Sequence, residues 1–114
     1  MPTGVGSFTC FDNKFNCHFN VDGFQVACSG KFSNYVPPFF VPVATITYDN
    51  LRDFNGPFAI LPPPPPLSFV GPDTVDITFT NPKTKARLHL TGNLVPPFDI
   101  RYIVVGEGLW VIRD

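Results

Sequence analysis

Residues 14–28, KFNCHFNVDGFQVAC, alternate apolar and polar side chains on both sides of an Asp-Gly pair. An alternation with a period of two is typical of a half-buried β-strand, and Asp-Gly is a preferred centre of the type I′ turn that joins two strands of a hairpin. With this turn, Cys17 faces Cys28 and the apolar side chains fall on one face. A type I turn with a bulge would slip the register and put Phe24 opposite a polar residue, so we favour the type I′ hairpin.

The three cysteines, Cys10, Cys17 and Cys28, lie in the first quarter of the chain. The hairpin brings Cys17 and Cys28 within the separation of a disulfide, but an odd number of cysteines is unlike the framework of a secreted domain. We therefore interpret the cysteines as free thiols in a reducing compartment. The N-terminus has no basic region followed by an apolar segment, so we expect a cytoplasmic protein or a leaderless secreted one. No apolar run reaches the length of a membrane span.

A second hairpin turns at residues 81–84, NPKT. A four-residue loop there pairs Ile77 with Leu88 and Asp76 with His89, which leaves the apolar residues on one face. The Asp76 and His89 side chains resemble part of a catalytic triad. We interpret them as a charge pair on an exposed sheet face, because no Ser or Cys lies in a nucleophile motif.

The end of the chain holds two nearly continuous apolar runs, at residues 100–105 and 109–113, separated by Gly-Glu-Gly. We predict a last hairpin that turns at residues 106–108. Alternation does not choose its inner face, so a proline loop, a partner subunit or a ligand has to cover the second face.

The composition favours an all-β fold, since the 114 residues include 13 Phe but only one Met. Short strands with turn signals every ~8 to 12 residues predict a single β-sandwich domain over residues 1–114, of immunoglobulin-like or jelly-roll type. A small closed β-barrel is the alternative. The immunoglobulin Cys…Trp…Cys spacing is absent, because the only Trp is Trp110.

The segment LPPPPPL at residues 61–67 divides the chain, and VPPF occurs on each side of it, at residues 36–39 and 95–98. Five prolines in a polyproline helix span ~15 Å, comparable with the ~10 Å between packed sheets plus the turns at either end. We favour a proline-rich crossover, a stiff strut between two sheets, over a polyproline motif that an SH3, WW, EVH1 or profilin-type partner would bind.

We expect a non-enzymatic recognition protein that binds a glycan or a small apolar ligand through aromatic and Asp/Asn-rich loops. The candidate ligand-binding residues are Tyr48, Asp49, Asn50, Asp53, Asn55 and Trp110. The candidate interface residues, which suit a homo-oligomer, are Phe39, Phe40 and Phe98. The alternative is a structural or self-assembling interaction module that displays the polyproline run at residues 61–67.

The net charge is −1 and the basic residues are scattered, so we predict no nucleic-acid partner. The Asp/Asn-rich loop does not have the spacing of a calcium loop, and the two His residues lack metal-ligand spacing. We therefore expect no catalytic residues, no cofactor and no metal site.

Overall fold

The computed structural model describes residues 2–65 and 67–113, and this part of the chain is all-β. Its strands are β1 (Thr3–Phe11), β2 (Lys14–Val21), β3 (Phe24–Phe32), β4 (Phe39–Thr47), β5 (Gly56–Ile60), β6 (Phe69–Val70), β7 (Thr74–Thr80), β8 (Arg87–Asn93), β9 (Tyr102–Ile103) and β10 (Gly106–Arg113), and one 3₁₀ turn, η1 (Leu51–Phe54), lies between β4 and β5. Within the described residues, no helix has the length and apolar character that a membrane crossing would require.

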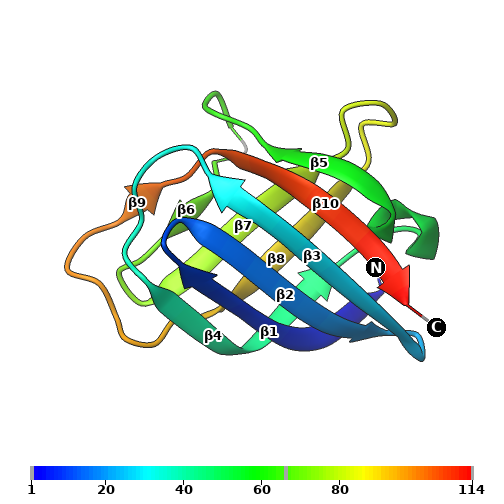
Figure 1. Cartoon of the computed structure of the whole chain (residues 1–114), viewed down its shortest axis with the longest axis horizontal. Helices are drawn as coiled ribbons and strands as arrows, with labels where there is room; N and C mark the ends of the chain where they lie inside the picture. The colour runs from blue at the N-terminus through cyan, green and yellow to red at the C-terminus, as the bar shows by residue number, and fades with distance from the viewer. Residues whose placement is uncertain (1, 66, 114) are drawn as a thin grey trace.

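Most of the strands form one closed antiparallel barrel (Figure 1). Around the ring the order is β5, β10, β3, β2, β1, β4, β8 and β7, and the pair Ala59–Thr80 joins β7 back to β5. β6 pairs with the first half of β7, and β9 pairs with β6, so these two short strands extend the sheet beyond the ring.

The all-β prediction is confirmed, and the small closed β-barrel that we weighed as the alternative is the observed architecture. The preferred two-sheet sandwich is right only in part, because the strands belong to one continuous sheet. A sheet of eight twisted strands can close on itself, which pairs the edge groups that a sandwich leaves open.

Two tight turns build the first three strands, and both have the type I′ conformation. Asp22 and Gly23 have φ angles of 51° and 82°, and Asp12 and Asn13, between β1 and β2, have φ angles of 56° and 64°. Positive φ at both central residues is what a type I′ turn requires. The predicted register of β2 against β3 is confirmed, with Cys17 opposite Cys28.

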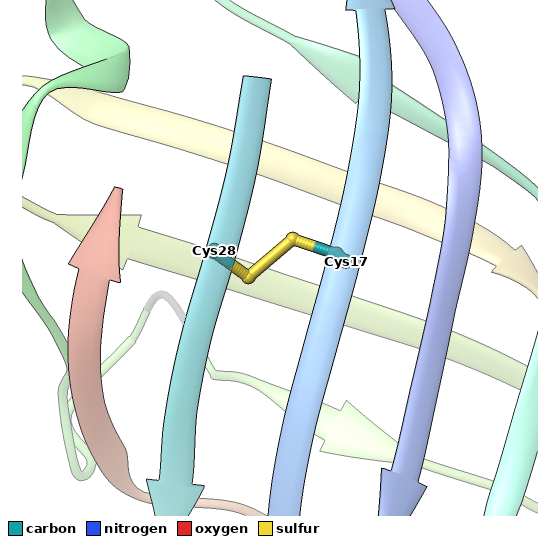
Figure 2. The surroundings of a disulfide bond; sticks show 2 residues. All are labelled: Cys17 and Cys28. Atoms are coloured by element: carbon teal, nitrogen blue, oxygen red, sulfur yellow. A yellow bond between two sulfur atoms is a disulfide. The ribbon is translucent and has the colours of Figure 1, made fainter. Parts of the chain in front are cut away.

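This register carries a disulfide between Cys17 and Cys28, whose Cα atoms are 5.2 Å apart (Figure 2). The interpretation of this pair as free thiols is therefore wrong. Two cysteines directly opposite each other on the inner face of a hairpin already have the separation that a disulfide needs. Cys10 is free and buried, and desolvation by burial raises its pKa to about 11.

The predicted pairing of β7 with β8 is wrong by two residues. Ile77 pairs with Leu90, not Leu88, because residues 81–86 form a longer loop. The Asn81 side chain organises this loop by accepting hydrogen bonds from the backbone N–H groups of residues 83 and 84, at 2.8 and 3.1 Å. A shift of two residues preserves the alternation, so the predicted inner and outer faces still hold.

The predicted last hairpin is also wrong, because Gly106 and Gly108 lie inside β10 rather than in a turn. β10 pairs with β3 on one side and β5 on the other, and β9 belongs to the extension on β6. A Cβ at Gly108 would lie 2.6 Å from the ring of Phe58. These glycines therefore permit the close approach of neighbouring chain segments and do not mark a reversal of the chain.

The interior of the barrel is filled by aromatic side chains. Eight of the 13 Phe residues are buried, together with Trp110. At one end, η1 inserts Phe54 against Trp110, with ring centroids 5.1 Å apart. At the other end the two VPPF segments meet, since Phe39 and Phe98 pack edge to face at 5.8 Å. A small eight-stranded barrel has an interior just wide enough for side chains, so binding surfaces are to be sought on its outside and at its ends.

Candidate functional site

The predicted ligand-binding residues surround η1, but not all of them are accessible. Asp49, Asn50 and Asn55 are exposed and Asp53 is half-buried. The Asn50 side chain caps η1 by accepting a hydrogen bond from the backbone N–H of residue 52, at 3.2 Å.

Tyr48 and Trp110 are core residues, with 6% and 2% of their surface exposed. The structure does bring them to this loop, because both rings contact Phe54. They support the loop from beneath and present no surface to a ligand. Ligand binding by the four polar residues of the loop stays a prediction.

The predicted interface residues separate into one exposed ring and two that pack inward. Phe40 is 43% exposed, whereas Phe39 is 3% exposed. Phe98 is half-buried between Phe39 and Tyr102. Of the three, only Phe40 offers a substantial apolar surface to a partner.

The proline run joins β5 to β6, and both of these strands pair with β7. Leu61, residues 62–65 and Leu67 are exposed, and the chain bends at residues 63–65. Pro66 lies outside the described residues. Whether this crossover serves as a strut or as a partner motif stays a prediction.

A groove at the opposite end of the barrel from η1 holds the two most exposed aromatic side chains of the described residues. Phe11 is 72% exposed and Tyr35 is 69% exposed. The groove has a volume of about 610 Å³ and is lined by Phe11, Asp12, Asn13, Tyr35, Val36 and Pro38. Its lining residues belong to the β1–β2 turn and to the loop from β3 to β4, and both of these segments are at the left of Figure 1.

The backbone of this groove is fixed by two asparagine side chains. Asn13 donates to the carbonyl oxygen of Asn34 and accepts from the N–H of Val36, both at 2.9 Å. Asn34 donates to the carbonyl oxygen of Ile103 at 2.9 Å and accepts from the N–H of Val105 at 3.2 Å. The loop from β3 to β4 is thus tied to the β1–β2 turn on one side and to the segment before β10 on the other. A ligand would meet a preorganised surface, which lowers the entropy cost of binding.

The groove combines flat apolar surface with a hydrogen-bond acceptor. In the described part of the chain, neither Phe11 nor Tyr35 stacks on another aromatic ring. The exposed Asp12 carboxylate can accept hydrogen bonds from hydroxyl groups. The volume lies within the ~300–1,000 Å³ of small-molecule sites. The arrangement suits a ring that has an apolar face and a polar edge.

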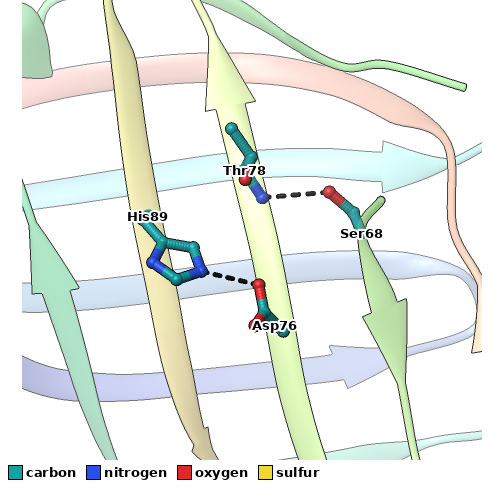
Figure 3. Close-up of polar contacts among 4 residues, drawn as sticks. All are labelled: Ser68, Asp76, Thr78 and His89. Carbon is teal, nitrogen blue, oxygen red and sulfur yellow. Dashed lines mark hydrogen bonds and ion pairs between the residues drawn. The ribbon is translucent and has the colours of Figure 1, made fainter. Parts of the chain in front are cut away.

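The Asp76–His89 pair lies on the outer face of β7 and β8 (Figure 3). His89 Nε2 lies 2.6 Å from Asp76 Oδ1, and both side chains are partly exposed. The Ser68 hydroxyl lies on the other side of β7 and accepts a hydrogen bond from the N–H of Thr78 at 2.9 Å. The predicted charge pair is confirmed. Among the described residues, no group of three or more His, Cys, Asp or Glu side chains gathers in a way that suits a metal ion.

Phe11 and Tyr35 were not among the residues that the sequence singled out. A signal for Phe11 is present, because it lies out of phase with the buried Phe8 and Cys10 and directly before a turn. An aromatic residue at an outward position of a strand end is a candidate for binding. Tyr35 has no periodicity to mark it, since it lies in a loop. Comparison of the chain with protein-family models, curated proteins and solved structures gives no match.

Proposed function

We propose that this protein is a non-enzymatic recognition protein that binds a saccharide ring in the groove between Phe11 and Tyr35. The observation that carries the proposal is the pair of aromatic side chains, 72% and 69% exposed, on a turn and a loop that asparagine hydrogen bonds tie to the rest of the barrel. Leaving a large apolar side chain in water forgoes roughly 1.5–3 kcal/mol of burial free energy. Two such side chains in one groove are therefore typical of a binding surface.

A saccharide fits this groove better than a wholly apolar ligand does. The C–H face of a sugar ring can stack on Phe11 and Tyr35, while its hydroxyl groups hydrogen-bond to Asp12 and to the Tyr35 hydroxyl. A lipid chain would leave the Asp12 carboxylate without a partner and would favour an enclosed cavity. Within the described residues, buried aromatic and aliphatic side chains occupy the barrel interior.

The test is a glycan array followed by isothermal titration calorimetry on the glycan that binds. Phe11→Ala and Tyr35→Ala should each weaken binding up to about tenfold, because ring contacts of this kind contribute ~0.5–1.5 kcal/mol. Phe24→Ala is the matched control, since Phe24 is also an exposed ring, 38% exposed, at the far end of the β2–β3 hairpin. Unchanged affinity in both groove variants, or an array and a lipid screen without any ligand, would contradict the proposal.

Self-association is the second candidate, favoured by an apolar surface on β1 and β4. Val5, Phe40, Val43 and Val95 are 56%, 43%, 67% and 53% exposed. Phe40 and Val95 exchange two backbone hydrogen bonds of 2.8 and 2.7 Å, which brings the second VPPF segment alongside β4. Surfaces of this kind suit a homo-oligomer. Sedimentation as a monomer at high micromolar concentration, unchanged by Val43→Lys, would exclude this function.

The Cys17–Cys28 disulfide supports an oxidising site of action rather than the cytoplasm. Disulfides persist in extracellular and similar compartments and are reduced in the cytosol. Mass spectrometry of the protein isolated from its native source under thiol-blocking conditions should find these two cysteines unblocked. Blocked Cys17 and Cys28 would favour the cytoplasm.

A further inference from the structure

A second groove lies on the outer face of β2, β3 and β10. Its volume is about 460 Å³, and its floor includes Gly30 and Gly108, which pair directly across β3 and β10. Polar and charged side chains border it: Lys14, Asn16, Ser29, Lys31 and Glu107. All five of these side chains are exposed.

This groove adjoins the aromatic groove at the β1–β2 turn. The two grooves share no lining residue, but Lys14 of the second groove pairs with Phe11 of the aromatic groove across this turn, and both side chains are exposed. At its other end it shares Asn16 and Ser29 with a hollow of about 130 Å³ that reaches His18. The four residue-to-residue steps from Lys14 to His18 along β2 add about 13 Å to the binding path.

The side chains along this path offer donors and acceptors in a balanced mixture. The cationic groups are Lys14, Lys31 and Arg113, the carboxylates are Asp12 and Glu107, and the amide, hydroxyl and imidazole groups are Asn16, Ser29 and His18. Within residues 2–65 and 67–113, the ion pair between Asp76 and His89 is the only one. The charged side chains along the binding path therefore form no ion pairs with one another. Leu109 and Val111, 48% and 45% exposed, add apolar surface beside the polar groups.

This mixture selects the chemistry of the occupant. A polyanion would be repelled by Asp12 and Glu107, and a polycation would be repelled by the lysines. A neutral polyhydroxylated chain uses both kinds of group, since each hydroxyl donates and accepts. Its C–H faces can rest on the two aliphatic side chains.

We infer that the occupant is a linear neutral oligosaccharide, with one ring between Phe11 and Tyr35 and the following units along the outer face of β2, β3 and β10. This inference rests on the proposed function, because the aromatic groove anchors the chain. The inference adds to the proposed function that the ligand is several units long, that it is uncharged, and that it makes a second set of contacts on β2, β3 and β10.

The test is calorimetry of the intact protein with a chain-length series, from disaccharide to hexasaccharide, of the neutral glycan that binds best on the array. Affinity should rise at least about tenfold along the series. Asn16→Ala combined with Lys31→Ala should remove this gain, so that the hexasaccharide binds no more tightly than the disaccharide. Asn20→Ala is the control, because Asn20 is the same residue type, exposed on the same strand and outside the grooves.

The outcomes separate this inference from the proposed function. Disaccharide binding that depends on Phe11 but does not strengthen with chain length would overturn the inference and leave the proposed function standing. Tighter, salt-sensitive binding of a uronic-acid chain of the same length would overturn the neutral class. Absence of binding to every member of the series would overturn both proposals. The substituted side chains are exposed, and an unchanged melting temperature of each variant checks that the fold is intact.

Discussion

Reduction of the Cys17–Cys28 disulfide should destabilise the barrel by an amount that the loop length sets. The two cysteines are 11 residues apart. Closing a loop of this size lowers the chain entropy of the unfolded state and stabilises the fold by about 2.8 kcal/mol near room temperature. A chain of 114 residues has an unfolding entropy of roughly 240 cal/mol/K. The melting temperature should therefore fall by about 12 °C on reduction.

The assay follows thermal unfolding through the fluorescence of Trp110, the only tryptophan and a buried one. Cys17 and Cys28 are 1% and 4% exposed, so the protein is unfolded in reductant and refolded before the measurement. Thiol alkylation and mass spectrometry verify that the bond is open. The double variant Cys17→Ala/Cys28→Ala controls for reductant, because its melting temperature should not respond. An unchanged melting temperature of the fully reduced wild-type protein would refute the reasoning.

Three further predictions concern the packing of the barrel, at the glycines, at Cys10 and at Phe54. Gly6→Ala should lower the free energy of unfolding by about 3 kcal/mol in urea titrations, because a Cβ there would overlap the backbone of β2. Gly23→Ala is the control: a Cβ at Gly23 has open space but a φ of 82°, so this variant should lose only about 1 kcal/mol. Equal losses in the two variants would argue against the close approach of β1 to β2 at Gly6. Cys10 should stay unlabelled by a thiol reagent in the native protein at neutral pH and react once after unfolding. Burial raises the pKa of Cys10 from 9.0 to about 11, so between these two pH values the folded state keeps the thiol proton that the unfolded state releases. The free energy of unfolding should therefore fall as the pH rises from 9.0 to about 11, and Cys10→Ala should lack this part of the fall. Phe54→Ala should lower the free energy of unfolding by about 3–5 kcal/mol and shift Trp110 emission to longer wavelength, because it opens one end of the core. Unshifted emission would argue against the closure of this end of the barrel by Phe54.

Local patterns predicted the hairpins well where turn chemistry and alternation agreed. The Asp22-Gly23 turn and the pairing of Cys17 with Cys28 followed from the sequence, because a type I′ turn leaves one register that keeps the apolar face intact. The 81–86 loop was misjudged, because the hydrogen bonds of the Asn81 side chain lengthen it without changing which face each residue takes.

The glycines of β10 show why the last strands were mispredicted. Gly106 and Gly108 have the composition of a turn, yet each sits where a neighbouring backbone or ring leaves no room for a Cβ. That constraint comes from strands distant in the sequence, so no local pattern reports it. The same holds for Trp110, which looked like a loop aromatic and is a core residue at 2% exposure.

Part of the candidate site could likewise be predicted from the sequence and part of it could not. The sequence favoured aromatic and Asp/Asn-rich loops, and the groove is built from such a turn, Asp12-Asn13 beside Phe11. It did not show that Tyr35, more than 20 residues away, would line the same groove, because that depends on the side chains of Asn13 and Asn34 joining separate loops.

The sequence by itself determined that the chain is all-β, which side chains face inward in the strands that alternate clearly, and the register of its first long hairpin, since these follow from a period of two and from turn chemistry. Only the tertiary structure decided that the strands close into a barrel, that two cysteines form a bond and that Phe11 and Tyr35 share a groove. Alternation is the same in a sandwich and in a barrel, and closure depends on the twist accumulated over eight strands.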